Sequence, residues 1–167
     1  MMMRFVASAT FAAAGGIVGF AFADKLRREQ KLCALIVRLL QRTAFLVGYR
    51  CDDVYSVCAE LRRDSELSAL TFLESLPKSF KSGENFRICW ENAVRSAGFA
   101  DDEEDVLLKL GNIIGRSDSE SQVDSIRWLE RTLSETEKKR SEAYLRKGRL
   151  YRSVGLLFGV MVGILVI

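Results

Sequence analysis

The chain has 167 residues, 49% of them hydrophobic, and its 25 Lys and Arg against 22 Asp and Glu give a formal net charge of +3. It has no histidine, the side chain that most often serves as catalytic base, proton shuttle or metal ligand. Its four cysteines form no C-x-x-C pair, and it lacks the G-x-x-x-x-G-K-[S/T] phosphate loop. These absences argue against an enzyme, a metal site and a bound cofactor, and we expect the cysteines to be buried small hydrophobes.

The first predicted element is an apolar helix over residues 5–23. It would be about 28 Å long, close to the ~30 Å hydrocarbon core of a bilayer. Lys and Arg beside a span remain on the cytoplasmic side. We therefore expect residues 1–23 to form an N-terminal transmembrane anchor. The basic cluster after it comprises Lys25, Arg27, Arg28 and Lys31.

The same segment has a second interpretation as a removable signal peptide. Ala21-Phe22-Ala23 matches the small-residue pattern of a cleavage site. Two observations favour an uncleaved anchor instead. The apolar stretch exceeds the roughly 7–15 residues of a signal-peptide core, and the basic cluster would have to cross the membrane against its usual bias.

The middle of the chain, residues 24–152, shows apolar residues at helical spacing and no sustained alternation of the strand type. It is long enough for one domain with its own core. We predict an all-α protein: a single cytoplasmic bundle of about six helices, flanked by N- and C-terminal membrane helices. The expected helices cover residues 25–48, a short stretch after Asp53, a stretch from Ser65 to before Pro77, 85–97 closed by Gly98, 101–114, and a long helix after Ser117.

Charge is segregated along this middle region. Residues 24–50 hold seven basic and two acidic side chains, a net of +5, and residues 138–152 hold seven and one, a net of +6. Residues 51–137 hold ten basic and nineteen acidic side chains, a net of −9. Basic ends suit anionic lipid headgroups, whereas an acidic centre suits a basic protein partner and argues against nucleic acid.

We interpret the acidic turns, which we expect at the end of the bundle far from the basic flanks, as a candidate partner-docking surface. The competing interpretation is that these residues only begin helices, where carboxylates complement the macrodipole. The candidate docking residues are Asp52, Asp53, Asp101, Asp102, Glu103, Asp118 and Glu120.

The last predicted element, residues 153–167, is apolar and would cover about 22 Å as a helix, which is short for a span. We expect a C-terminal transmembrane segment that is membrane-inserted, and leave its complete crossing open. Glycines four residues apart let helices in lipid approach closely, although glycine is also frequent in such helices for other reasons. The candidate packing glycines are Gly15, Gly19, Gly155, Gly159 and Gly163.

Two stretches near the C-terminus resemble the stage III sporulation protein AB family of endospore-forming bacteria. The first is residues 110–122, Leu-Gly-Asn-Ile-Ile-Gly-Arg-Ser-Asp-Ser-Glu-Ser-Gln, and the second is residues 150–159, Leu-Tyr-Arg-Ser-Val-Gly-Leu-Leu-Phe-Gly. The resemblance extends more weakly over the whole chain. Members of the family often have His-Ile where this chain has Ser125-Ile126, a difference that touches no assigned catalytic role. The family-motif residues are Gly115, Asp118, Gln122 and Tyr151.

The resemblance implies a subunit of a secretion-like complex that is made in the mother cell and placed in the membrane around the forespore. The domain between the membrane segments is then similar to the inner-membrane platform protein of type II secretion and type IV pilus systems. Its implied role is a scaffold that couples a partner ATPase, which has its own phosphate loop, to a channel. The implied partners are the membrane, that ATPase and other subunits of the complex, with a homo-oligomer possible.

Two other functions compete with this one. A platform or adaptor protein of a secretion or pilus system outside sporulation would carry tandem copies of the helical domain, and this chain has one. A membrane-anchored enzyme would need a catalytic constellation, and the sequence offers none.

Overall fold

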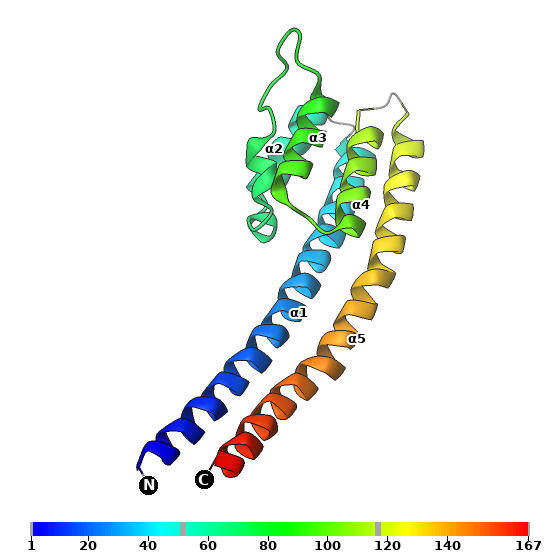
Figure 1. The fold of residues 1–167 in the computed structure, drawn as a ribbon. Helices are drawn as coiled ribbons and strands as arrows, with labels where there is room; N and C mark the ends of the chain where they lie inside the picture. The colour runs from blue at the N-terminus through cyan, green and yellow to red at the C-terminus, as the bar shows by residue number, and fades with distance from the viewer. Residues whose placement is uncertain (1, 51–52, 116–117, 167) are drawn as a thin grey trace. The chain divides into compact units, whose positions relative to one another are not determined.

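The computed structural model describes the backbone of residues 2–50, 53–115 and 118–166, and every regular element in these ranges is helical (Figure 1). The fold class predicted from the sequence, all-α, is confirmed. Two 3₁₀ turns, η1 (Ser65–Leu67) and η2 (Thr71–Ser75), accompany the α-helices. The α-helices are α1 (Met2–Arg50), α2 (Val54–Arg63), α3 (Phe86–Ala97), α4 (Asp101–Ile113) and α5 (Ser119–Val166).

The chain divides into two compact units, and α1 and α5 each contribute residues to both. We call Met1–Leu32 with Glu137–Ile167 the terminal unit, and Cys33–Thr136 the helical domain. In the terminal unit, the side-chain amide of Gln30 donates a hydrogen bond to Glu137 at 3.2 Å. The apolar residues 5–23 and the predicted helix 25–48 form one continuous helix, α1, and α5 likewise continues into residues 153–166.

One helical segment is long and apolar enough to cross a membrane among the residues whose side chains are described: Asp24–Tyr49, near the N-terminus. Much of its apolar surface already has protein neighbours. Ile36, Leu39 and Leu40 are fully buried in the helical domain, so the second half of this segment is a core helix. The predicted spans, 5–23 and 153–167, fall mostly on residues whose side chains lie outside the description, and they stay predictions.

The core of the helical domain follows the apolar stripes of its helices. On α1 the buried residues include Cys33, Ile36, Leu40, Thr43 and Val47, which recur at steps of three and four residues. α5 returns alongside α1: the Gln41 amide donates to Glu130 at 2.7 Å, and the Cys33 thiol lies 3.9 Å from the Leu133 carbonyl oxygen. Trp90, Leu110 and Ile126 are fully buried contributions from α3, α4 and α5.

Short polar side chains begin two of the helices where the sequence places them. The Asp53 carboxylate accepts hydrogen bonds from the backbone N–H groups of Tyr55 and Ser56, and Asn85 accepts one from Arg87. Gly98 ends α3 with φ of +69°, the left-handed conformation that glycine adopts at no steric cost.

The helix expected between Ser65 and Pro77 is wrong, and the spacing of its leucines explains why. Leu67, Leu70, Leu73 and Leu76 are all buried and recur every three residues, which is the period of a 3₁₀-helix and not that of an α-helix. Each of these four residues donates its backbone N–H to the carbonyl oxygen three residues before it. Two 3₁₀ turns therefore replace one α-helix, because only the tighter period keeps this stripe facing the core.

Candidate partner-binding surfaces

The loop between α4 and α5 is built by three of the family-motif residues. Gly115 has φ of +91°, a conformation that strains any residue with a Cβ atom. Its N–H donates to the side-chain oxygen of Gln122 at 3.3 Å, and the Gln122 N–H donates to the Asp118 carbonyl oxygen at 3.2 Å. Gln122 is buried, so this part of the motif holds a turn in place. The side chain of Tyr151 lies outside the described residues.

Most of the candidate docking carboxylates that are described lie at the surface. Asp101, Asp102, Asp118 and Glu120 are exposed. Asp53 is also exposed, but its carboxylate already caps α2, and the hydrogen bonds from Ser56 lower its pKa. Asp52 lies outside the described residues.

Glu103 is not available to a partner, which corrects the sequence prediction. Its side chain is 1% exposed, and it lies on the inward face of α4 with Leu107 and Leu110, one and two turns further along. A carboxylate in the first turn of a helix complements the macrodipole whether it points inward or outward. The acidic run alone therefore could not show which of its members the helix buries.

The sequence led us to expect the candidate carboxylates together at one end of the helical domain. In the structure they do not gather at one end. Asp101 begins α4, whereas Asp118 and Glu120 come just after α4 ends. An α-helix of 13 residues is about 20 Å long, so the two groups are separated by the length of α4. Figure 1 shows the loop that joins α4 to α5 at the opposite end of α4 from its start.

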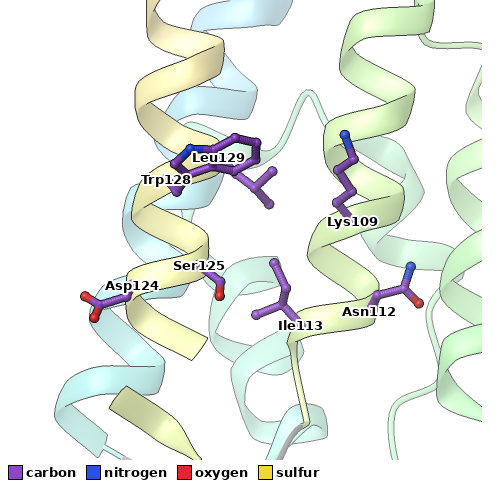
Figure 2. Close-up of a pocket in the computed structure, with 7 residues that line it drawn as sticks. All are labelled: Lys109, Asn112, Ile113, Asp124, Ser125, Trp128 and Leu129. Carbon is purple, nitrogen blue, oxygen red and sulfur yellow. The ribbon is translucent and has the colours of Figure 1, made fainter. Parts of the chain in front are cut away.

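An open groove between α4 and α5, with a volume of about 480 Å³, is a feature that the sequence did not indicate (Figure 2). Trp128 stands at its edge with 61% of its surface exposed, while Ile113 and Leu129 are buried beneath. The lining residues are Lys109, Asn112, Ile113, Asp124, Ser125, Trp128 and Leu129.

A second groove of about 450 Å³ lies on the other side of α5, against the end of α1. Its aromatic wall is the stacked pair Phe45 and Tyr49, whose ring centroids are 5.5 Å apart and whose side chains are 52% and 80% exposed. Glu120 and Arg127 line the same groove. Glu120 is thus the candidate docking residue that the structure places beside exposed aromatic rings, a combination enriched in protein interfaces.

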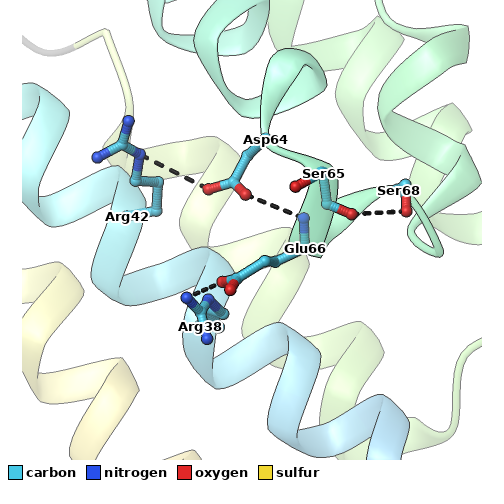
Figure 3. Close-up of polar contacts among 6 residues, drawn as sticks. All are labelled: Arg38, Arg42, Asp64, Ser65, Glu66 and Ser68. Atoms are coloured by element: carbon cyan, nitrogen blue, oxygen red, sulfur yellow. Dashed lines mark hydrogen bonds and ion pairs between the residues drawn. The ribbon is translucent and has the colours of Figure 1, made fainter.

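A third polar hollow, between α1 and η1, has a structural role (Figure 3). Arg38 forms an ion pair with Glu66, and the Arg42 guanidinium lies 3.8 Å from the Asp64 carboxylate. Asp64 also accepts the backbone N–H of Glu66, so the two pairs hold η1 on α1. Because acids balance the arginines here, the hollow does not have the excess positive charge of an anion site.

Comparison with known proteins now adds to this geometry. A family model described as stage III sporulation protein AB matches residues 4–167. The chain belongs to the stage III sporulation protein AB family. No curated protein and no solved structure matches the chain. The resemblance seen in the sequence is thereby confirmed, and it indicates a role in stage III of sporulation.

The described cysteines of this stage III sporulation protein AB member lie wholly or partly inside the domain. Cys33 and Cys58 are buried and Cys89 is half-buried. Burial raises the pKa of Cys58 to about 12, which keeps this thiol protonated at neutral pH. In the described part of the chain, no group of three or more Cys, Asp or Glu is arranged to hold a metal ion.

Proposed function

We propose that this stage III sporulation AB protein is a membrane-anchored scaffold of a secretion-like complex around the forespore, and that it docks a partner ATPase without supplying chemistry. The continuity of its two long helices carries the proposal. α1 has 49 residues and α5 has 48, so each is about 72 Å long and passes unbroken from the helical domain into an apolar end of the chain. An unbroken helix of this kind would link a membrane segment rigidly to the protein domain that it enters.

Exposed apolar side chains near the end of α5 support membrane insertion. Val154, Leu157 and Met161 are each more than half exposed, and their spacing of three and four residues places them on one face of the helix. Large apolar side chains in water are unfavourable by roughly 25 cal/mol per Å² of surface, and lipid tails would remove that cost. The basic flanks favour a cytoplasmic position for the helical domain, and the resemblance to the sporulation family implies that this is the mother-cell side.

Labelling of introduced cysteines in cells tests this topology. Met3→Cys reports on the N-terminus and Ser79→Cys on an exposed loop of the helical domain. In non-sporulating cells that express the chain in their cell membrane, a membrane-impermeant maleimide should modify the first in intact cells and the second only after permeabilisation. Modification of Ser79→Cys in intact cells would place the domain on the other side and contradict the proposal.

Helix packing in the membrane is the second part of the scaffold role. Gly155, Gly159 and Gly163 recur at four-residue steps within α5, and small residues at that spacing allow close helix approach. We expect Gly159→Leu to reduce cross-linking to membrane partners while the helical domain keeps its melting temperature. The control is Leu157→Phe, because two residues along a helix lead to the side away from the glycines, so the added bulk falls off their face. Equal effects of the two variants would rule out a glycine packing face.

The docking surface for the ATPase is proposed at the α4–α5 loop, where Asp118 and Glu120 are exposed and Glu120 lines the groove beside Tyr49. Opposite charge on a partner raises its association rate in a salt-dependent way. The paired reversal Asp118→Lys with Glu120→Lys should therefore slow binding of the purified ATPase and flatten its salt dependence. Asp101→Lys with Asp102→Lys changes charge equally at the other end of α4. If that control slows binding and the loop variant does not, the ATPase docks elsewhere.

A further inference from the structure

The α4–α5 groove has an exposed tryptophan side chain at its edge and an apolar depression into which another aromatic side chain could fit. Trp128 projects at the edge of the groove with 61% of its surface exposed, beside the buried side chains of Ile113 and Leu129. Exposed tryptophan next to an apolar depression is typical of an interface anchor, because burying the indole removes a large apolar area from water. A partner that carries the same two features could fill the depression and have its own depression filled.

The charges at the groove are also paired. Figure 2 shows Lys109 on α4 and Asp124 on α5, with the Asp124 carboxylate turned outward, away from α4. Asp124 also borders the second groove, beside Phe45 and Tyr49. Lys109 already lies 2.6 Å from Asp105 along its own helix, and its ammonium group has further donors to offer. Asp124 is exposed. One cation and one anion leave the groove with no net charge, in contrast to the acidic loop of Asp118 and Glu120.

From these features we propose that the α4–α5 groove binds a second copy of this chain through a two-fold contact. In a two-fold interface the same patch faces itself, so a residue that contacts another is contacted by that residue's twin. Each Trp128 then enters the other copy's groove, and each Lys109 faces the other copy's Asp124. A partner with a strongly basic or acidic surface would match one of these two charges and repel the other, whereas an identical copy matches both.

This contact is separate from the proposed ATPase docking and needs neither nucleotide nor the loop carboxylates. Two copies anchored to one membrane would meet at a raised effective concentration, so an interface of modest size could suffice. The contact at the groove would then arrange the subunits of the complex in pairs. Failure of the ATPase proposal leaves this one standing, and its own test uses the purified chain alone.

Charge reversal with a mixing step tests the two-fold contact. The full chain is purified in mild detergent, and its dimer dissociation constant is measured by sedimentation equilibrium. We expect Lys109→Glu alone and Asp124→Lys alone each to raise that constant roughly tenfold or more, since each places like charges together twice. An equimolar mixture of the two variants should recover wild-type affinity, because both contacts in the mixed dimer again join opposite charges.

Arg87→Glu is the matched control. Arg87 is exposed on α3, and like Lys109 it pairs with a carboxylate one turn away, Glu91 at 3.0 Å. Its reversal should leave the dimer unchanged. A wild-type chain that stays monomeric, single reversals without effect, or a mixture that associates no better than its components would each overturn the proposal.

Trp128 supplies a second measurement that does not depend on charge. Trp128→Ala truncates an exposed side chain, so the domain should keep its fold while the dimer dissociation constant rises at least tenfold. In the wild type, the fluorescence of Trp128, taken as the difference from Trp128→Phe, should shift to shorter wavelength as the chain associates. An emission maximum that stays constant across the dissociation range would show that the indole remains in water and would refute the contact.

Discussion

A tryptophan lies beside each of two opposite faces of α4, and one of them is buried whereas the other is exposed. On one face Trp90 is fully buried, its indole N–H donates to the Leu107 carbonyl oxygen at 2.7 Å, and its ring meets Phe72 edge-on at 5.6 Å. On the other face Trp128 lies mostly in solvent at the edge of an open groove. The helix is the same, and so is the residue type that packs against it.

The difference arises from how closely the neighbouring helix approaches α4 on each face. Gly111 faces Trp90, and a Cβ atom added there would lie 2.2 Å from the indole Cδ1, so the absence of a side chain lets the ring seat against the α4 backbone. On the opposite face, α4 and α5 leave an open groove between them that Lys109 and Asn112 line on the α4 side. A tryptophan that is enclosed and hydrogen-bonded stabilises its own domain, whereas one left open is available to another molecule.

Removing the enclosed ring is the strongest test of this contrast. Trp90→Ala should destabilise the helical domain by about 3–5 kcal/mol, because it leaves a large cavity between α3 and α4 and removes a buried hydrogen bond. Thermal unfolding followed by circular dichroism measures the effect. A loss below about 1 kcal/mol would mean that the Trp90 face is no better packed than the groove.

Filling the space beside Trp90 should have the next largest effect. Gly111→Ala should cost about 1–3 kcal/mol, since the rigid indole must shift to admit the new methyl group. Gly48→Ala is the control, because it is also helical and its new Cβ would lie 3.1 Å from the Val123 Cγ2 methyl group, a much looser contact than the one at Gly111. There the better helix propensity of alanine offsets the tighter contact. Equal melting temperatures for the two variants would contradict the close approach at Gly111.

Substitutions in the loop between α4 and α5 are expected to lower the free energy of unfolding less than those beside Trp90. Gln122→Ala removes the acceptor for the Gly115 N–H and should cost about 1 kcal/mol, the net value of one such hydrogen bond, because water can replace it at the exposed glycine. Ser121→Ala, at the exposed neighbouring position, should leave the unfolding free energy nearly unchanged. If the Ser121 variant loses as much stability as the Gln122 variant, the loop does not depend on this bond.

Truncating the open ring should have the smallest effect on the fold. Trp128→Ala should change the free energy of unfolding by less than about 0.5 kcal/mol when measured at protein concentrations low enough to keep the chain monomeric. The measurement is the same thermal unfolding used for Trp90. A loss above about 2 kcal/mol would place Trp128 in the core of its own domain and remove the contrast between the two faces.

Much of the architecture was predictable, because local chemistry specifies it. The helical stretch of residues 25–48, the start of α2 after Asp53, and Gly98 at the end of α3 all lie where the sequence indicated. The leucines from 67 to 76 carried a signal as well, since their period of three predicts 3₁₀ turns. That signal was missed because an apolar run of this length was assigned the commoner helical period.

The sequence by itself determined the elements, because hydrophobic period, caps and glycine conformation act over a few residues, and its motif of Gly115, Asp118 and Gln122 led to the family. The tertiary structure alone decided the surfaces. It turned Glu103 inward and enclosed Trp90 while leaving Trp128 open. Burial depends on which neighbouring helix meets a given face and how closely it approaches, and residues far apart in the chain set that distance.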